Sequence, residues 1–189
     1  QWPSSAASDV YKRQEYGFTV IQNCKTEMSS VEKIAKKIGY VRESIFGGLW
    51  SFESNEDKAD SAYTQEELRP HTDSTYSNDA PGLQLLLCCH YKASGGESIM
   101  VDGFKIAEKI KNEKKEIYDL LTQIEVTGHY IGDGVFLKAK RPIFRVNSDS
   151  ELIQVSFNNY DRAPFKFSED KTKKFYEAIK EFDLIANNK

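Results

Sequence analysis

The chain has 189 residues, of which 39% are hydrophobic and 29% charged, with a formal net charge of -3. This length suits one domain with a sizeable core, and the slightly acidic balance offers no basic stripe for a nucleic-acid partner. No apolar run approaches the length of a membrane span, and no signal peptide is visible, so no membrane partner is expected. The cysteines Cys24, Cys88 and Cys89 form no C-x-x-C pair, which favours reduced, buried thiols of a cytosolic type.

The N-terminal part of the chain begins with residues 1–14, which are aperiodic and rich in Ser and Ala. They are expected to be a disordered or non-native lead-in. Residues 16–22 alternate and include β-branched side chains, which predicts a strand. Ser29 and Glu32 have the spacing of a capping box, and Gly39 marks a helix end. Between them, apolar residues at helical spacing predict a short amphipathic helix: Val31, Ile34, Ala35 and Ile38.

Residues 42–81 form a long, weakly periodic segment that is rich in aromatic side chains. A segment of this kind inside a domain is usually functional or disordered, and its aromatic content argues against disorder. At its centre lies His71-x-Asp73. Residues i and i+2 of an extended segment point to the same side, so this imidazole and carboxylate can converge. With a second histidine they would form a 2-His-1-carboxylate face for Fe(II). Taken alone, the motif is weak, and a surface turn explains most occurrences of it.

The middle of the chain predicts a hairpin followed by helices. The near-continuous apolar run Leu83–Tyr91 predicts a strand buried on both faces, and Gly95-Gly96 predicts a turn to a partner strand at Ser98–Val101. Asp102 is placed to cap a helix. That helix is expected to face inward with Phe104, Ala107 and Ile110, and the next one with Ile117, Leu120, Leu121 and Ile124.

The C-terminal part returns to short strands, predicted at residues 126–131, 143–146 and 152–157. Ser168 is expected to cap a last helix, whose inward face carries Phe175, Ile179, Phe182 and Ile185. Strands with a helical insertion predict an α+β or mainly β chain. The architecture expected is a β-sandwich or jelly-roll flanked by helices.

Six ordered blocks of residues together resemble the γ-butyrobetaine and trimethyllysine hydroxylase family of Fe(II)/2-oxoglutarate dioxygenases, within the wider taurine-dioxygenase-like group. The resemblance runs from about Tyr16 to the C-terminus, and Asp60 with the last block favours the trimethyllysine branch. The blocks are Arg42-Glu43-Ser44-Ile45-Phe46-Gly47-Gly48-Leu49-Trp50, Ala62-Tyr63-Thr64, His71-Thr72-Asp73, Gly95-Gly96-Glu97-Ser98, Val101-Asp102-Gly103-Phe104 and Asn158-Asn159-Tyr160-Asp161-Arg162-Ala163.

The resemblance implies a double-stranded β-helix and a small-molecule substrate with a trimethylammonium group. Fe(II) and 2-oxoglutarate are implied as cofactors, and ascorbate is left open. His71 and Asp73 would bind iron, and Ser98 would bind 2-oxoglutarate. For the substrate, the implied residues are Trp50 and Tyr63 as an aromatic box, Asp60 at the other end and Asn159 orienting that end. Aromatic faces suit a quaternary ammonium, which donates no hydrogen bond. Phe46 stands where a tyrosine is common, so its place in the box is less secure.

The family's distal histidine and the arginine that follows it have no counterpart in this sequence. Too few strands lie between Asp73 and His129 for His129, with Arg141 behind it, to replace them. His129 is therefore interpreted as a strand-end or surface histidine, and His90, at the end of the predicted buried strand, as a structural one. Residues 15–189 are expected to be an incomplete catalytic domain, truncated before the last barrel strands, which would bind iron poorly and be inactive by itself.

The activity expected of the complete enzyme is hydroxylation of trimethyllysine at carbon 3, in carnitine biosynthesis. Three alternatives stay open: γ-butyrobetaine as the substrate, a non-catalytic betaine-binding module, and a purely structural role for Trp50 and Tyr63. A homodimer of the full-length protein is left open. The expected compartment is the cytoplasm, or the mitochondrion in a eukaryote.

Overall fold

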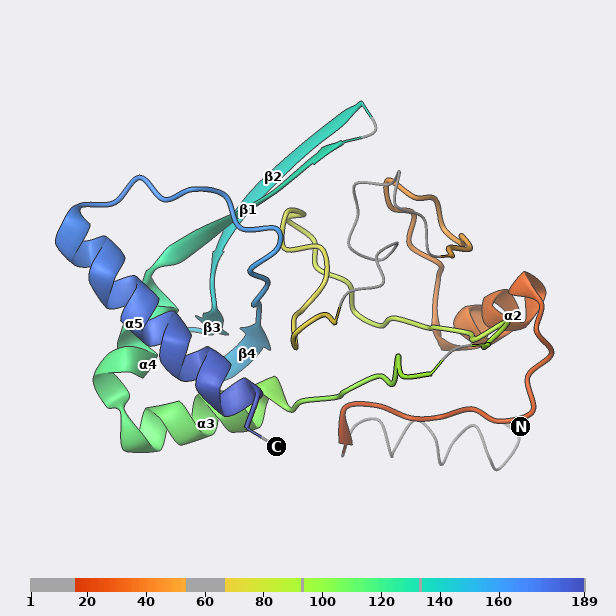
Figure 1. Ribbon diagram of the computed structural model, residues 1–189, viewed down its shortest axis with the longest axis horizontal. Helices are drawn as coiled ribbons and strands as arrows, with labels where there is room; N and C mark the ends of the chain where they lie inside the picture. Colours follow the sequence, from red (N-terminus) through yellow and green to blue (C-terminus); the bar gives the residue numbers. More distant parts are fainter. Residues whose placement is uncertain (1–15, 54–66, 93, 133, 189) are drawn as a thin grey trace. The chain divides into compact units, whose positions relative to one another are not determined.

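The computed structural model describes residues 16–53, 67–92, 94–132 and 134–188 of the chain. The chain divides into two units (Figure 1). The first unit comprises Gln1–Phe52 and Leu83–Gly96, and the second comprises Glu53–Gly82 and Glu97–Lys189. Of the helices in the described ranges, none combines the length and hydropathy that a bilayer span requires.

The first unit contains helix α2, Met28–Ile38, which confirms the helix predicted from the spacing of apolar residues. Gly39 ends the helix as predicted, and its backbone N–H donates to the carbonyl of Ala35. The capping-box prediction is wrong, because Ser29 lies inside the helix and Glu27 takes the N-cap position without a side-chain cap. The Ser29 hydroxyl instead donates to the Glu27 carboxylate at 3.2 Å.

Three predicted strands, at residues 16–22, 83–91 and 98–101, are absent, and these segments are irregular. Most of their side chains are exposed, and Leu86 keeps 65% of its surface accessible. A strand requires the hydrogen bonds of a neighbouring strand, and no described residue pairs with these segments in a sheet. The prediction of buried thiols is also wrong, because Cys88 and Cys89, in the segment predicted as a buried strand, are exposed. Cys24 is half-buried, and all three cysteines are free.

The second unit contains helices α3, Gly103–Glu113, α4, Lys115–Gln123, and α5, Glu169–Ala186. Asp102 caps α3 as predicted, since its carboxylate accepts the backbone N–H groups of Phe104 and Lys105. Ser168 holds the N-cap position of α5, but its side chain makes no cap hydrogen bond. The inward prediction for Phe104 is wrong, because its side chain is 49% exposed and Ile106 is buried in its place.

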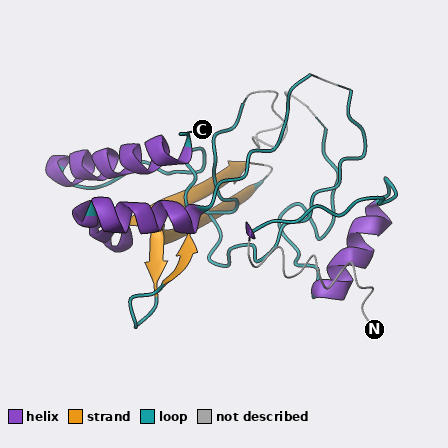
Figure 2. Ribbon diagram, turned by 90° about the horizontal axis from the view of Figure 1, so that it is seen from below, coloured by secondary structure: helices purple, strands orange, loops and turns teal. Residues whose placement is uncertain are grey.

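The strands of this unit form two separate antiparallel pairs (Figure 2). β1, Glu125–Gly132, pairs with β2, Val135–Pro142, and β3, Phe144–Val146, pairs with β4, Leu152–Val155. β1, β3 and β4 confirm the predicted strands, whereas β2 was not predicted. The Asp133-Gly134 sequence is typical of a tight hairpin turn and would have indicated it.

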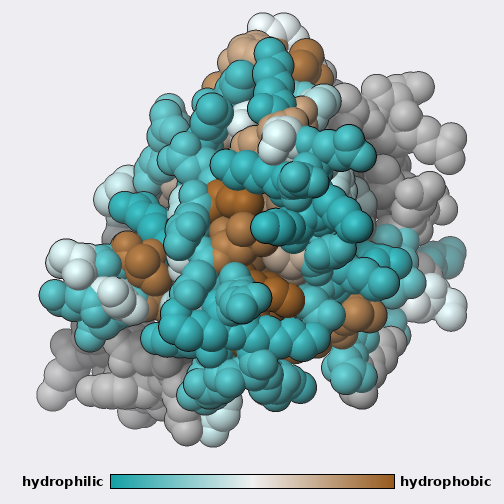
Figure 3. Space-filling view, turned by 90° about the vertical axis from the view of Figure 1, so that its left-hand side faces the viewer, coloured by the Kyte–Doolittle hydropathy of each residue, from teal (hydrophilic) through white to brown (hydrophobic). Residues whose placement is uncertain are grey.

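The core of the second unit lies where α3, α4 and α5 pack against one another and against the strands. Phe144, Phe175 and Leu121 are completely buried there. The face of the molecule in Figure 3 is largely hydrophilic, with apolar patches between the hydrophilic side chains. Helices packed on antiparallel strand pairs make this unit α+β, as predicted. The jelly-roll stays a prediction, because the described strands form only these two pairs.

Residues 161–163 follow the edge of β1 that β2 leaves open. The backbone N–H of His129 donates to the carbonyl of Asp161 at 2.8 Å, and the N–H of Ala163 donates to that of Thr127 at 2.8 Å. Gly128 and Arg162 form an isolated antiparallel bridge between these two bonds. The C-terminal sequence block is thereby fixed to the sheet, next to the segment that carries His71.

Candidate functional site

His71 and Asp73 lie in an irregular segment of the second unit, and their side chains point at one another. The Nε2 atom of His71 is 3.3 Å from Oδ1 of Asp73, with 21% and 43% of the two side chains exposed. The convergence expected from their i, i+2 spacing is therefore present. Both side chains are still accessible to solvent, so an additional ligand can approach them.

The other ring nitrogen of His71, Nδ1, lies 2.7 Å from the backbone carbonyl of Arg69. A carbonyl can only accept, so Nδ1 carries a proton in both the neutral and the charged ring, and Nε2, directed at Asp73, carries the second proton of the charged ring. A fixed Nδ1–H of this kind is how proteins orient a metal-binding imidazole. The hydrogen bond to Asp73 raises the pKa of His71 above its ordinary value, with a smaller contribution from Arg69, while burial opposes the shift.

The pair fits two positions of a divalent metal site. Ligand atoms about 2.1 Å from a metal and at right angles to each other lie about 3 Å apart, close to the separation of Nε2 and Oδ1. A metal ion would take the place of the proton that the two groups share. Within the described ranges, no third His, Cys, Asp or Glu joins them in a group that could hold a metal.

Tyr160 packs against the ring of His71. Their ring centroids are 5.7 Å apart in an edge-to-face arrangement at 78°. The Tyr160 hydroxyl accepts the backbone N–H of Arg69 at 3.0 Å, and the Arg69 guanidinium pairs with Asp183 of α5 at 2.8 Å. Arg69, two residues before His71, is therefore held both by the C-terminal block and by α5.

A cavity of about 270 Å³ opens beside these residues, and His71, Asn159, Tyr160 and Asp183 are among those that line it. The structure thus brings together two predicted site residues, His71 and Asn159. Asn159 is exposed, and its neighbour Asn158 folds back so that its amide oxygen accepts the N–H of Tyr160 at 2.8 Å. The exposed amide of Asn159 and the imidazole of His71 thus line the same cavity.

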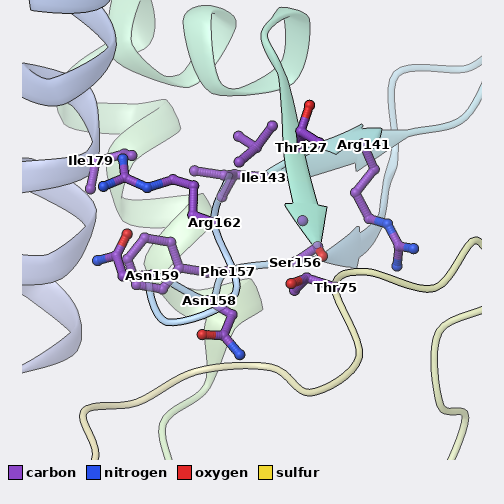
Figure 4. A pocket seen from close by; sticks show the side chains of 12 residues that line it. Thr75, Thr127, Arg141, Ile143, Ser156, Phe157, Asn158, Asn159, Arg162 and Ile179 are labelled. Carbon is purple, nitrogen blue, oxygen red and sulfur yellow. The ribbon is translucent and has the colours of Figure 1, made fainter. Parts of the chain in front are cut away.

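A second, smaller cavity of about 20 Å³ lies between Thr75, β1 and the C-terminal block, and it is large enough for about one water molecule (Figure 4). Arg141 and Arg162 line it, and each has a buried guanidinium nitrogen without a hydrogen-bond partner in the described structure. Burial lowers the pKa of Arg141. The two side chains extend to opposite sides in Figure 4, so they do not form a joint anion site.

Trp50 belongs to the first unit, where it is 44% exposed and lies beside Phe46, with ring centroids 5.5 Å apart. The turn before it is closed by Ser44 and Gly47, which exchange two backbone hydrogen bonds of 3.0 Å. This exposure does not fit the alternative that buries Trp50 in a core. The other predicted substrate residues, Asp60 and Tyr63, lie outside the described residues.

The remaining predicted residues lie in different surroundings. Ser98 is exposed in an irregular segment, so the strand expected to present its hydroxyl is absent. His129 lies within β1 rather than at its end, half-buried and opposite Lys138 in the register. His90 is exposed outside any strand, which does not fit a structural role.

The structure places three residues at the His-x-Asp segment that were not predicted as site residues: Thr75, Tyr160 and Asp161. Tyr160 and Asp161 belong to a block that the resemblance had marked. No signal in a single sequence connects that block with His71 at a separation of about ninety residues.

Several known proteins are similar to this chain over most of its length. The family model described as taurine catabolism dioxygenase TauD, TfdA family matches residues 5–189. A trimethyllysine dioxygenase of Meyerozyma guilliermondii is 37% identical over 92% of this chain and 45% of its own length. The mitochondrial trimethyllysine dioxygenase of Rattus norvegicus is 33% identical over 78% of this chain and 36% of its own.

A γ-butyrobetaine dioxygenase of a Pseudomonas species is 32% identical over 89% of this chain and 44% of its own length. The chain spans less than half the length of these curated relatives. Because the family model covers nearly the whole chain, the protein belongs to the taurine catabolism dioxygenase TauD, TfdA family.

Proposed function

We propose that the whole protein is an Fe(II)- and 2-oxoglutarate-dependent dioxygenase that hydroxylates a trimethylammonium amino acid. The observation that carries the proposal is the convergence of His71 Nε2 and Asp73 Oδ1 at 3.3 Å in a chain of this family. The substrate we propose is trimethyllysine, hydroxylated at carbon 3 for carnitine biosynthesis, since the 37% identical relative is a trimethyllysine dioxygenase. The fold proposed for the complete catalytic domain is the double-stranded β-helix.

His71 and Asp73 would hold the iron, with a distal histidine of the whole protein as the third ligand. Bound Fe(II) and 2-oxoglutarate supply the chemistry that places one oxygen atom of O2 in a C–H bond and the other in succinate, with release of CO2. The Arg69 carbonyl keeps the proton of His71 on Nδ1, so that the Nε2 lone pair is available to the metal. Ser98 is proposed to bind the co-substrate.

The two ends of the substrate would meet different chemistry. Trp50 and Tyr63 would offer aromatic faces to the trimethylammonium head, an interaction of about 2 kcal/mol or more once it is desolvated. Asp60 would attract the α-ammonium group, and the exposed amide of Asn159, beside His71, would orient the same end. The reacting carbon is next to the α-carbon, so this polar end has to bind close to the iron ligands.

The experiment that tests the proposal measures succinate formation and the hydroxylated product by NMR, with the whole protein, Fe(II), 2-oxoglutarate and trimethyllysine. We expect turnover that is lost in His71→Ala and in Asp73→Ala. Turnover that persists in both variants would refute the assignment of the ligands. Metal-free protein that binds trimethyllysine tightly, with no turnover under any condition, would instead favour a betaine-binding module.

γ-Butyrobetaine is the second candidate substrate, because a γ-butyrobetaine dioxygenase is 32% identical over 89% of the chain. The two substrates differ at the polar end: trimethyllysine has an α-ammonium group there, and γ-butyrobetaine has none. Asp60→Asn should therefore shift the ratio of kcat/KM values toward γ-butyrobetaine. An unchanged ratio would remove the reason for preferring trimethyllysine. For the compartment we propose the mitochondrion in a eukaryotic source, as named for the rat relative, and otherwise the cytoplasm.

A further inference from the structure

The segment that carries His71 and Asp73 has no regular secondary structure, so its position depends on individual contacts. Thr72 supplies one set of contacts. Its backbone N–H donates to the carbonyl of Phe157 at 2.7 Å, and its hydroxyl accepts the N–H of Phe157 at 2.9 Å. Thr72 stands between the two proposed ligands, so these bonds fix the backbone that both side chains extend from.

Thr75 supplies the second anchor, on the other side of Asp73. Its side chain is buried, and its hydroxyl donates to Oδ2 of Asp161 at 3.2 Å. Between Asp73 and Thr75, Ser74 has a φ of +56°, and its carbonyl accepts the N–H of Ser77 at 3.0 Å. The chain therefore turns sharply after Asp73, and the hydrogen bond of Thr75 fixes the position of this turn.

Asp161 is itself held by hydrogen bonds to His129 and Asn158. Its backbone carbonyl accepts the N–H of His129 in β1 at 2.8 Å. Its Oδ2 atom accepts the Asn158 amide at 2.9 Å, and Asn158 also accepts the Asp161 N–H at 3.4 Å. A carboxylate fixed in this way can hold the Thr75 side chain in place, because a hydrogen bond to a charged group is stronger than one between neutral groups.

We propose that Asp161 is a positioning residue for the proposed iron ligands, and that it acts on His71 and Asp73 through the hydroxyl of Thr75. The inference rests on the proposed function, since it assigns a metal to these two side chains. The hydroxyl of Thr75 connects Asp161 to the loop, and the charge of Asp161 also acts on His71, whose pKa it raises. Its effect is to hold the turn after Asp73 against β1, so that the carboxylate meets the imidazole on the side where Nε2 is available.

The test compares variants that break this one hydrogen bond with variants that preserve it. Thr75→Val removes the donor, Asp161→Ala removes the acceptor, and Thr75→Ser keeps the hydroxyl. Thr122→Val is the matched control, because Thr122 makes a partly buried hydroxyl bond of 2.8 Å to the carbonyl of Asp119 in α4, away from the loop. If Asp161→Ala does not fold, the Thr75→Val and Thr75→Ser pair still carries the test.

The first readout is hydrogen exchange of the Thr72 and Ser77 amides in the metal-free chain. Both amides are bonded within or beside the loop. We expect about tenfold faster exchange in Thr75→Val and in Asp161→Ala, because one anchor of the loop is lost. Thr75→Ser and Thr122→Val should exchange as the wild type does. Unchanged exchange in Thr75→Val would overturn the proposal.

The second readout is Mn(II) binding, followed by broadening of the His71 imidazole resonances, which are assigned with His71→Ala. Thr75→Val and Asp161→Ala should each raise the Mn(II) dissociation constant about tenfold, as loss of a residue that orients a ligand does. The double variant should be no weaker than Asp161→Ala alone, because Thr75→Val breaks a bond that Asp161→Ala has already removed together with the bond from Asn158. Thr75→Ser should bind within about twofold of the wild type.

Two failures can be told apart. If Mn(II) broadens His71 in the wild type and equally in Thr75→Val, Asp161 has a structural role alone and the inference is overturned, while the ligand assignment survives. If Mn(II) does not broaden His71 in the wild type, the ligand assignment itself fails, and this inference fails with it.

Discussion

His71 and Asp73 face each other across 3.3 Å, from Nε2 of the ring to Oδ1 of the carboxylate, while Nδ1 is occupied by the carbonyl of Arg69. In the metal-free chain this arrangement favours the protonated ring, and it raises the pKa of His71. A proton and a metal ion therefore compete for the same side of Nε2.

The first prediction concerns this pKa. Asp73→Asn should lower the pKa of His71, because the hydrogen bond to the carboxylate is the largest cause of its rise. The pKa in the folded chain lies above the ordinary value of about 6.5. The pair therefore stabilises the fold fully below that value, and the contribution is lost as the pH rises through the folded pKa. An NMR titration of the imidazole protons measures the shift, and an unchanged midpoint would contradict it.

A second prediction contrasts two phenylalanines. Phe144 has no exposed surface and contacts Tyr118 and Phe182, whereas Phe104 is 49% exposed. Phe144→Ala should lower the free energy of unfolding by about 3–5 kcal/mol, and Phe104→Ala by less than about 1 kcal/mol. Urea denaturation followed by circular dichroism measures both. Similar losses would show that Phe104 is part of the core after all.

The third prediction compares the N-caps of α3 and α5. Asp102 accepts two backbone N–H groups, at 2.9 and 3.1 Å, whereas the Ser168 side chain makes no cap hydrogen bond. Asp102→Ala should therefore cost about 1 kcal/mol of unfolding free energy. Ser168→Ala should cost clearly less, since no cap bond is lost. Thermal melts of the two variants decide the point, and equal shifts would contradict the difference in capping.

The fourth prediction concerns Gly128, which packs against the loop. A Cβ at this position would lie 2.6 Å from the Thr75 carbonyl oxygen and 2.7 Å from its carbonyl carbon. Backbone atoms cannot move aside cheaply, so Gly128→Ala should cost about 1–3 kcal/mol of unfolding free energy. Gly82→Ala is the control, because nothing lies within 4 Å of its Cβ position. Equal stability of the two variants would mean that the loop does not rest on β1.

The fifth prediction belongs to the whole protein and tests the proposed aromatic box. Trp50→Leu should raise KM for the trimethylammonium substrate about thirtyfold, which corresponds to a loss of about 2 kcal/mol. A substrate analogue with a neutral tert-butyl group in place of the trimethylammonium head is the control. Its KM should respond much less, because it lacks the charge that an indole face attracts. An equal response would assign Trp50 a packing role.

The helical part of the fold was largely predictable, because each helix carries its own pattern of apolar side chains. In α4 and α5 the predicted inward residues Leu121, Phe175, Ile179 and Phe182 are buried. In α3 the error at Phe104 arose because residues at the first turn of a helix can lie beyond the edge of the core. The segments at 16–22 and 83–91 were mistaken for strands because apolar alternation does not provide a hydrogen-bonding neighbour.

For the candidate site, the sequence was sufficient to place His71 beside Asp73, because the two are only two residues apart. It was not sufficient to find the residues that support them. Thr72 and Thr75 are bonded to Phe157 and Asp161, 85 and 86 residues further along the chain. Such pairings depend on how α3, α4 and the strands bring the C-terminal block back to the loop, which no local pattern encodes.

This separation has a consequence for the order of events during protein synthesis. A ribosome that has just released the His-x-Asp loop must add more than eighty further residues before Asp161 and its neighbours leave the exit tunnel. Until then the nascent loop lacks its hydrogen bonds to Phe157 and Asp161. Capture of a metal ion in the arrangement of the folded chain is thus expected only after the C-terminal block has emerged and bonded to the loop.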